Sequence, residues 1–189
     1  MNRSKIVRVY ESVIMRKIDI RDFDHPLYKA FQTLYACNFP IFEQRTTAQQ
    51  KAAFACAHYH LTACENDATL VGFISYWEFD TYLYVEHFAI STLIRGKGYG
   101  CEVLRDFIRS TRKIVLLEID PVTDSVSAAR LRFYRKCGFH ENPYPHRHPA
   151  YRAGYAPHPL IVLTAQRPIS AEEYQTFHRD LQTVVMRDH

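Results

Sequence analysis

The chain has 189 residues, 47% of them hydrophobic and 23% charged, and its formal net charge is +4 at pH 7. This length supports one hydrophobic core, and the composition excludes a disordered chain, a collagen-like repeat and a strongly basic nucleic-acid tail. No stretch approaches the roughly 20 apolar residues of a membrane span, and the N-terminal residues lack the apolar core of a secretion signal, so we expect one domain over residues 1–189, in the cytoplasm and away from membranes.

Helical patterns dominate the first third of the chain. Apolar residues recur at helical spacing after Pro26 and stop at Asn38–Phe39–Pro40, which predicts a first helix. A segment rich in Ala and Gln, from residue 46 or 47 to about residue 58, predicts a second helix. Residues 6–10 are a candidate for an additional strand before both helices.

β-Branched and aromatic residues become frequent after the second helix. They predict three strands, at residues 58–64, 68–77 and 82–90, with turn residues between them at Asn66–Asp67 and Asp80–Thr81. Such short connections predict an antiparallel meander. A Gly-rich loop at residues 95–100 then leads into a helix with its apolar residues on one face.

Strand and helix alternate in the last part of the chain. The patterns predict a strand at residues 113–119, a helix at 124–138 and a Pro-rich loop at 142–159. A strand at residues 159–164 and a final helix from residue 170 onward follow. Asp124 or Ser125 is the expected N-cap of the first of these helices, which ends at Gly138, and Ser170 and Glu173 form a capping box for the second. Three successive strands followed by this alternation indicate a mixed sheet with helices on its faces.

The segment most informative for function holds the strand YVEHFAI, the loop RGKGYG and the start of a helix. Glycines let a backbone approach a ligand closely, and the free amides at a helix N-terminus favour anionic oxygens. Arg95 and Lys97 add positive charge. The pattern therefore indicates a cradle for phosphate or pyrophosphate, and a Gly-rich turn with solvated basic residues is the alternative.

Two other phosphate-binding motifs do not fit this loop. A P-loop needs Ser or Thr after its lysine, and here Gly98 follows Lys97. A dinucleotide fingerprint needs GxGxxG in the first strand–helix turn, whereas this loop is one residue short and three strands come first. The charge distribution fits a polyanionic ligand, because residues 91–136 hold ten basic and five acidic residues, a net +5.

Two motifs in this region resemble those of the GNAT acyltransferase superfamily. RGKGYG, after a strand that ends in FAI, is similar to the family's acetyl-CoA loop, (R/Q)xxGx(G/A). SAARLRFYRKCGF, at residues 127–139, is similar to the family's NxxAxxxYxxxGF, with Tyr134 and Gly138–Phe139 at the expected spacing. The chain departs from that pattern at Ser127, where Asn is usual, and at Arg130, where a small residue is usual.

The resemblance covers residues 68–139 well and the rest of the chain only in general layout. It implies the family's α/β fold, a single mixed, mostly antiparallel sheet of six to seven strands in which two parallel neighbours splay apart, with helices on both faces and a C-terminal helix. It also implies an N-acetyltransferase that transfers an acetyl group from acetyl-CoA directly to a primary amine of a small molecule or peptide.

The same resemblance implies the residues that bind acetyl-CoA. Backbone groups of Phe88, Ala89 and Ile90 would pair with the pantetheine arm like an added strand, and Ser127 would donate a hydrogen bond to it. The pyrophosphate would bind the loop formed by Arg95, Gly96, Lys97, Gly98, Tyr99 and Gly100.

The resemblance also implies that Tyr134 is the general acid that protonates the departing thiolate. Glu86 is the candidate base, because alternation along a strand puts it on the same face as Phe88 and Ile90. By the same alternation His87 points to the opposite face and is interpreted as structural. A chain of water molecules that removes the proton of the amine, in place of a dedicated base, is an open alternative.

The His-rich segment after Gly138 contains an HxH sequence, but no Cys or carboxylate pattern completes a metal site, so we expect no metal. The five cysteines, odd in number and without a CxxC pair, are typical of reduced cytosolic thiols. Two sets of residues are candidates for the walls of an acceptor pocket, and the same residues are equally consistent with a core: Tyr144, Tyr151 and Tyr155, and Phe39, Phe42 and Glu43.

One alternative function is a CoA-binding or CoA-sensing module that keeps the fold and has lost transfer, as Ser127, Arg130 and the unsettled base would allow. Nucleic-acid binding is disfavoured, because the aromatic residues do not interleave with Lys and Arg in a recognised pattern. The sequence does not identify the amine, and it leaves a homodimer open.

Overall fold

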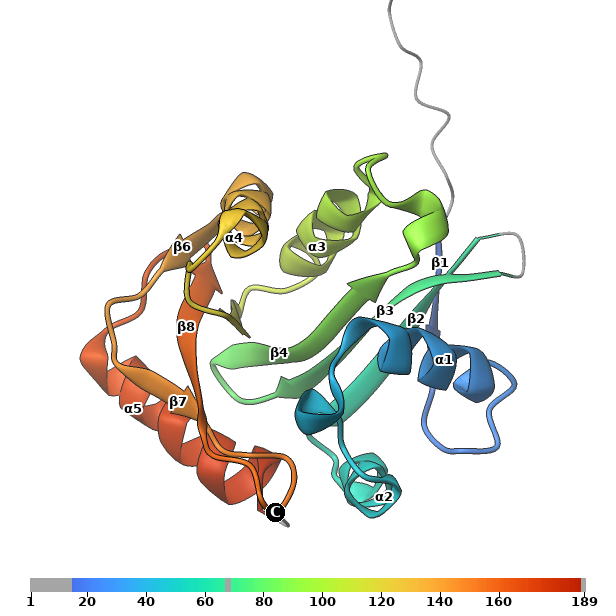
Figure 1. Cartoon of the computed structure of the whole chain (residues 1–189), viewed down its shortest axis with the longest axis horizontal. Coiled ribbons are helices and arrows are strands. Elements are labelled where there is room, and N and C mark those ends of the chain that lie inside the picture. The colour runs from blue at the N-terminus through green and yellow to red at the C-terminus, as the bar shows by residue number, and fades with distance from the viewer. Residues whose placement is uncertain (1–14, 67–68, 188–189) are drawn as a thin grey trace, which may run out of the picture.

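One mixed sheet runs through the molecule, and helices cover both of its faces (Figure 1). The structure is a computed structural model that describes residues 15–66 and 69–187. Within these residues the sheet has eight strands in the order β1-β2-β3-β4-β5-β8-β6, with β7 also paired to β8. The pair β4–β5 is parallel and the other described pairs are antiparallel. The strands are β1 (Arg16–Asp19), β2 (Tyr59–Asn66), β3 (Thr69–Glu78), β4 (Tyr82–Ile90), β5 (Ile114–Ile119), β6 (Phe139–Glu141), β7 (His146–His148) and β8 (His158–Ala165).

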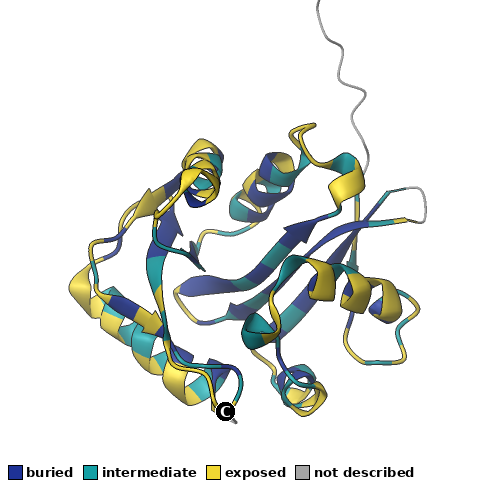
Figure 2. Cartoon of the chain, viewed as in Figure 1, coloured by how far each residue is buried: buried dark blue, intermediate teal, exposed yellow. Residues whose placement is uncertain are grey.

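Two hydrophobic cores lie on the two faces of the sheet. One core holds buried residues of α1 (Tyr28–Asn38), α2 (Thr47–Ala55) and α5 (Ala171–Asp180), and the other holds buried residues of α3 (Tyr99–Arg109) and α4 (Ser125–Cys137). Figure 2 shows buried residues along the strands and exposed residues on the outer sides of the helices. Three short helical turns complete the described elements, η1 (Ile41–Glu43), η2 (Thr92–Ile94) and η3 (Leu181–Val185). None of the helices in the described ranges is long and apolar enough to cross a bilayer.

Local capping sets where the helices begin and end. Three helices start at a capping box, in which the N-cap side chain and the third helical residue satisfy each other's backbone amides. The pairs are Thr46 with Gln49 for α2, Asp124 with Ser127 for α4 and Ser170 with Glu173 for α5. Gly138 ends α4 at φ +103°, a left-handed conformation that favours glycine. The caps predicted from the sequence for α4 and α5 are confirmed.

Most predicted elements are present, and three strands, β1, β6 and β7, are additional to them. β6 has only three residues, too few for a periodic signal, and pairing with β8 makes it a strand. β7 lies inside the segment predicted as a loop, because three residues between prolines give no periodic signal, and pairing with β8 makes them a strand. β1 was not predicted, and the candidate strand at residues 6–10 lies outside the described residues. With β1, β6 and β7 included, the described sheet has eight strands instead of six to seven.

β4 and β5 pair over only part of their length. The parallel pairing runs from Tyr82 opposite Ile114 to Val85 opposite Leu117. Beyond that point β4 continues to Ile90, while the end of β5 pairs with β8 on its other side. The two strands therefore splay apart, as the resemblance implied.

The splay begins at a β-bulge on β4. His87 lies opposite Ser75, but Val85 lies opposite the next residue, Tyr76, so Glu86 is an additional residue with no partner of its own. A bulge shifts the alternation of side chains by one residue. As a result, Ala89 joins the core of the α1 face and Ile90 joins the core of the α3 face.

Candidate active site

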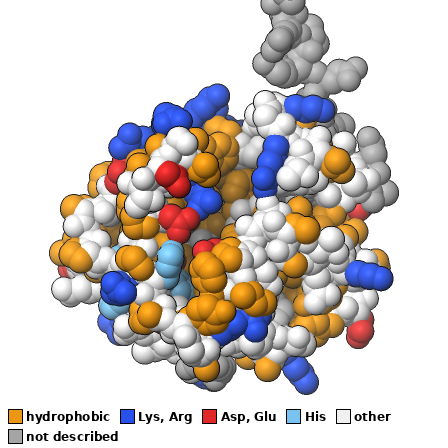
Figure 3. Space-filling view, viewed as in Figure 1, with side chains coloured by type: hydrophobic (Ala, Val, Ile, Leu, Met, Phe, Trp, Pro, Cys, Tyr) orange, Lys and Arg blue, Asp and Glu red, His pale blue; other side chains and the backbone are white. Residues whose placement is uncertain are grey.

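A cavity of about 1130 Å³ lies where β4 and β5 separate. Its lining comes from β4, the end of β5, the segment between α1 and α2, the loop before α3, α4, and the segment that joins β7 to β8. Figure 3 shows a hollow in this face of the molecule, with acidic and histidine side chains on its rim and Lys and Arg side chains around it. The cavity therefore collects residues from segments far apart in the sequence.

The loop before α3 has the geometry of an anion site. Gly96 and Gly98 have φ values of +79° and +92°, which glycine adopts without steric cost. Gly98 is the N-cap of α3, and within the described chain the backbone amides of residues 96–100 donate to no protein group. The positive end of the helix dipole lies behind these amides, so they are positioned to bind phosphate oxygens.

Most of the predicted cofactor residues meet at this cavity. Its lining includes Phe88, Ala89, Ile90, Arg95, Gly96, Gly98, Tyr99 and Gly100. The Nε atom of Arg95 donates to the carbonyl oxygen of Ile90 over 3.0 Å, and its guanidinium also donates to Asn38, so it ties the loop to β4 and α1. Lys97 is exposed and lies outside the lining.

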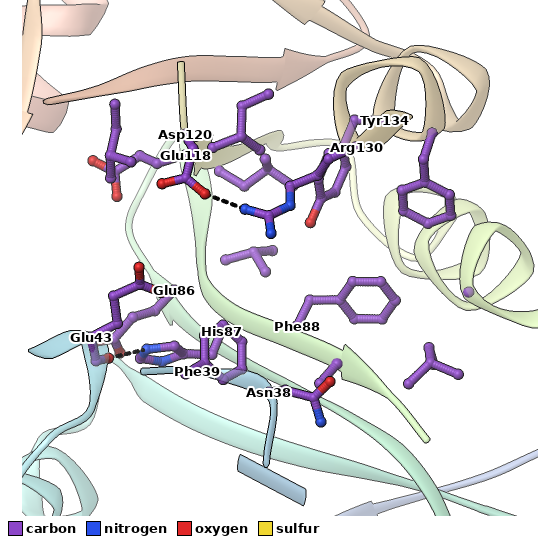
Figure 4. A pocket seen from close by; sticks show the side chains of 18 of the residues that line it. Asn38, Phe39, Glu43, Glu86, His87, Phe88, Glu118, Asp120, Arg130 and Tyr134 are labelled. Atoms are coloured by element: carbon purple, nitrogen blue, oxygen red, sulfur yellow. Dashed lines mark hydrogen bonds and ion pairs between the residues drawn. The ribbon is translucent and has the colours of Figure 1, made fainter. Parts of the chain in front are cut away.

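Tyr134 extends from α4 into the cavity, with its hydroxyl group directed inward (Figure 4). Burial raises the pKa of Tyr134 to about 12, so the phenol keeps its proton at neutral pH. No described residue forms a hydrogen bond with this hydroxyl. Its proton is therefore available to a ligand, as a general acid requires.

The structure corrects the role expected for Ser127. Its Oγ atom accepts hydrogen bonds from the backbone amides of Thr123 and Asp124, each 3.0 Å away, and lies 2.8 Å from an Asp124 carboxylate oxygen. These bonds use the hydroxyl to cap α4, and Ser127 is absent from the cavity lining. Ser127 is therefore not positioned to hold the pantetheine arm.

Arg130, the other departure from the family pattern, lines the cavity. Its guanidinium forms an ion pair with Asp120, just beyond the end of β5 (Figure 4). This contact joins α4 to the strand from which β4 has separated.

The prediction for the face of Glu86 was wrong, because the bulge interrupts the strict alternation on which it rested. Glu86 lies on the α1 face together with His87, and its carboxylate is fully buried. Arg45 contacts Oε1 at 2.7 Å, Tyr151 donates to the same oxygen over 2.9 Å, and the indole of Trp77 donates to Oε2 over 2.8 Å. The carboxylate is thus held by donors from three separate segments.

These contacts decide the charge of Glu86. Burial alone would raise its pKa, but the Arg45 guanidinium and the other partners outweigh burial and lower the pKa to about 2. A carboxylate held ionised in this way accepts a proton weakly. Glu86 lines the cavity, but its contacts disfavour it as the base and give it a structural role.

His87 is buried beside this ion pair and also lines the cavity. Its Nε2 atom is 3.0 Å from the backbone oxygen of Glu43, so that nitrogen carries the hydrogen. Burial lowers the pKa of His87 to about 4, which keeps the ring neutral at neutral pH. These contacts fit the structural role that the sequence indicated for His87. The sequence placed His87 on the face opposite to Glu86, whereas in the structure both residues lie on the α1 face.

Two segments form the walls of the other half of the cavity. Phe39, Phe42 and Glu43 line it from the α1–α2 side, and Tyr151 and Tyr155 line it from the β7–β8 side. The walls are fastened together, because Arg152 donates to the Ile41 carbonyl over 2.7 Å and Gln49 donates to the Tyr151 carbonyl over 2.7 Å. Tyr144 is outside the lining and stacks on Tyr174 instead.

An acidic group lies in this half of the cavity. Glu43, Asp120 and His158 each offer a ligand atom within 4.8 Å of the others. Burial and the nearby Asp120 raise the pKa of Glu43, whose carboxylate has no hydrogen bond or ion pair within the described residues. Asp120, in contrast, is paired with both Arg130 and His158.

Sequence reasoning missed three buried residues beside this group, Glu118, His146 and His148. Glu118 accepts a hydrogen bond from Tyr84 over 2.5 Å and forms an ion pair with His146, while the Nε2 atom of His148 lies 3.9 Å from Oε2. A glutamate within the apolar strand LLEID was the available signal, because buried carboxylates are rare unless they have partners. The HxH sequence by itself indicates a possible metal site and does not indicate that either histidine contacts Glu118.

Comparison with known proteins agrees with this arrangement. The chain matches the Acetyltransferase (GNAT) family profile over residues 26–139. It is 29% identical over 102 residues to YjbC of Bacillus subtilis (strain 168), whose name places it among acetyltransferases, and the match covers 52% of this chain and only 50% of that protein.

Solved structures share the fold. A protein from Bacteroides thetaiotaomicron, named as a GNAT-family acetyltransferase, superposes with a TM-score of 0.83 at 27% identity, over 90% of this chain and 97% of its own. A GNAT acetyltransferase from Elizabethkingia anophelis with acetyl-CoA bound superposes with a TM-score of 0.55 at 16% identity, over 81% of this chain and 98% of its own.

The splayed strands, the glycine loop and the α4 tyrosine occur together around one cavity, and the matched profile spans more than half of the sequence. The chain therefore belongs to the GNAT acetyltransferase family.

Proposed function

We propose that the protein transfers an acetyl group from acetyl-CoA to a primary amine by direct attack of the amine on the thioester. The observation that carries this proposal is the placement of the free amides of residues 96–100 and the Tyr134 hydroxyl on one cavity. One group is suited to phosphate and the other to proton donation, and a CoA thioester needs both.

The proposed position of acetyl-CoA follows the open edge of β4. The pyrophosphate binds the amides of residues 96–100, and Lys97 offsets its charge from the solvent side. The pantetheine arm lies along Phe88, Ala89 and Ile90, where β4 has separated from β5. The cavity is large enough for such a ligand, and the neighbour from Elizabethkingia anophelis was solved with acetyl-CoA bound.

In the proposed reaction, a neutral amine forms a bond to the acetyl carbonyl carbon while the bond from that carbon to sulfur breaks. Tyr134 donates its proton to the departing sulfur, which lowers the barrier to its departure. The cavity brings the two substrates together and so removes the entropic cost of their encounter.

The acceptor half of the cavity supports an amine that arrives as a cation. Glu43 supplies a carboxylate without an ion-pair partner among the described residues, and Asp120 lies beside it. Phe42 and Tyr155 face each other with ring centroids 5.8 Å apart and give the same region an apolar frame. The proposed acceptor is therefore a cation with an apolar or aromatic part, and Glu43 contributes to its attraction into the cavity.

Two measurements test the proposal. Calorimetry with acetyl-CoA and with CoA should show binding, and the release of free thiol should follow when primary amines are added. Absence of binding at millimolar acetyl-CoA would contradict the proposal. Binding without thiol release across a broad panel of small and peptide amines would instead identify a CoA-binding module that has lost transfer.

A further inference from the structure

The β7–β8 side of the cavity contains a histidine with an unused ring nitrogen. His148, at the end of β7, lines the cavity and is only 4% exposed. Its Nε2 atom is buried and has no hydrogen-bond partner within the described residues. Buried polar atoms nearly always have partners, so such an atom indicates a site where a ligand supplies one.

The contacts of His148 define its protonation state. Nδ1 is 2.6 Å from the backbone oxygen of Pro149, which can only accept, so Nδ1 carries a hydrogen. Nε2 has Glu118 as its nearest acidic neighbour, and the 3.9 Å to Oε2 exceeds hydrogen-bond distance. With its hydrogen on Nδ1 and no hydrogen-bond partner on Nε2 among the described residues, His148 has Nε2 open to a ligand.

His146, two residues earlier, has contacts on both ring nitrogens. Tyr174 uses its hydrogen to bond the Pro145 carbonyl over 2.9 Å, so its oxygen accepts from His146 Nδ1, 3.1 Å away. The other nitrogen, Nε2, contacts the Glu118 carboxylate. Both ring nitrogens of His146 are therefore engaged, and neither offers a free lone pair to a ligand. Nε2 of His148, in contrast, has no such contact among the described residues.

The other charged and titratable groups around His148 are compatible with a proton on its Nε2 atom. From β4 these are His87, which is neutral, and Glu86, which is paired with the buried Arg45. From β8, His158 lies opposite His148 in the strand register and is paired with Asp120. From the following loop, Tyr151 stacks on the His148 ring with centroids 4.9 Å apart. Each buried ion pair near His148 contains one positive and one negative group. A proton on Nε2 would have Glu118 Oε2 as a direct neighbour.

We propose that His148 accepts the proton of the acceptor amine and that Glu118 binds the amine in its ammonium form. The 3.9 Å between Nε2 and Oε2 lets one ammonium nitrogen lie within hydrogen-bond distance of both atoms. This inference rests on the proposed function, and it supplies the base that Glu86 does not provide.

The proton balance is complete. The ammonium gives one proton to His148 Nε2, and the resulting amine forms its bond to the thioester carbon. As the bond between carbon and sulfur breaks, sulfur takes a proton from Tyr134, and the second proton of the nitrogen restores the phenol through solvent. One ammonium and one acetyl-CoA thus yield an acetamide, a free CoA thiol and one proton, which His148 holds until solvent removes it.

The first test does not depend on activity. Nitrogen-15 spectra of the full-length protein, with and without saturating CoA, report the protonation of each histidine nitrogen, and the spectrum of His148→Gln assigns the signal. We expect Nε2 of His148 to be unprotonated and Nδ1 protonated near neutral pH. A doubly protonated His148 in that range would overturn the proposal, since an imidazolium cannot act as a base.

The second test is kinetic, with the best acceptor from the amine panel. We expect His148→Gln to lower kcat/KM by about 100-fold near neutral pH, with recovery as the pH rises, while acetyl-CoA affinity is unchanged. The loss should shrink with acceptors of lower pKa, which need less help to lose a proton, whereas a misfolded variant would lose activity with every acceptor alike. His140→Gln, on the exposed side of β6, is the matched control.

The outcomes separate the two proposals. If acetyl-CoA does not bind, the proposed function fails, and the spectra still decide the state of His148. If the wild-type protein transfers acetyl groups and His148→Gln retains its full pH profile, the role of His148 alone is overturned.

Discussion

Arg45 and Glu86 form an ion pair of 2.7 Å in which the two side chains are 4% and 0% exposed. Arg45 lies just before the N-cap of α2 and Glu86 lies at the bulge of β4. The Arg45 guanidinium also donates to the Val185 carbonyl over 3.0 Å. This pair therefore connects three parts of the chain at the wall of the cavity, which Glu86 lines. Its consequences for stability can be measured.

Glu86→Gln should lower the free energy of unfolding by about 3 kcal/mol, because it leaves a buried guanidinium without its counter-charge. Urea unfolding followed by circular dichroism measures this change. Glu141→Gln is the control, since it breaks the exposed pair with Arg135 and should cost less than about 1 kcal/mol. Equal stability of the two variants would mean that the Arg45–Glu86 pair contributes little.

The same pair predicts a dependence of stability on acid. The folded pKa of Glu86, about 2, lies below the 4.5 of an unperturbed glutamate, so the unfolded state binds the proton more readily. The stabilisation is complete above pH 4.5 and is lost as the pH falls toward 2. Thermal unfolding of wild type and Glu86→Gln across this window should converge at low pH. A constant difference between them would contradict the assigned pKa.

Tyr134→Phe should lower kcat by about 100-fold and leave the affinity for acetyl-CoA unchanged, because it removes a proton donor without changing the shape of the cavity. Single-turnover thiol release and calorimetry separate the two effects. Tyr76→Phe, on β3 and away from the cavity lining, should retain activity. Unchanged turnover in Tyr134→Phe would remove this residue from the mechanism.

Gly98→Ala tests the anion loop against a control with the same backbone requirement. Gly98 and Gly154 both have positive φ, +92° and +88°, and a Cβ at either would meet nothing within 4 Å. Both substitutions should therefore cost about 1 kcal/mol of backbone strain. Only Gly98→Ala should also weaken acetyl-CoA binding, by about tenfold, since its amide lies in the cradle. Similar affinities in the two variants would contradict the phosphate site.

Glu43→Gln should raise KM for a cationic amine about fivefold, which corresponds to the loss of about 1 kcal/mol from a partly exposed charge contact. Affinity for acetyl-CoA should stay the same, because Glu43 lies between α1 and α2, away from the glycine loop. Initial rates against acceptor concentration provide the measurement. A rise in KM for acetyl-CoA, with KM for the amine unchanged, would contradict the placement of Glu43 in the amine site.

Local features were predictable from the sequence. The glycine loop and the caps of α4 and α5 each depend on a few consecutive residues, whose backbone preferences act before any long-range contact forms. The motif placed Tyr134 on the helix that follows β5. That helix, α4, covers the sheet, and Tyr134 on it lines the cavity. The +5 charge of residues 91–136 likewise marked the region around the glycine loop.

Only the tertiary structure decided which polar groups meet. Arg45 and Glu86 are separated by 41 residues, and Glu118 and His146 by 28, so their contacts depend on sheet order and register, which short-range patterns do not encode. One additional residue in β4 moved Glu86 to the other face, because side chains alternate with a period of two and any insertion reverses it. The sequence by itself determined the glycine loop and the position of Tyr134 on α4. The folded chain decided that Glu86 pairs with Arg45 and that Nε2 of His148 has no hydrogen-bond partner among the described residues.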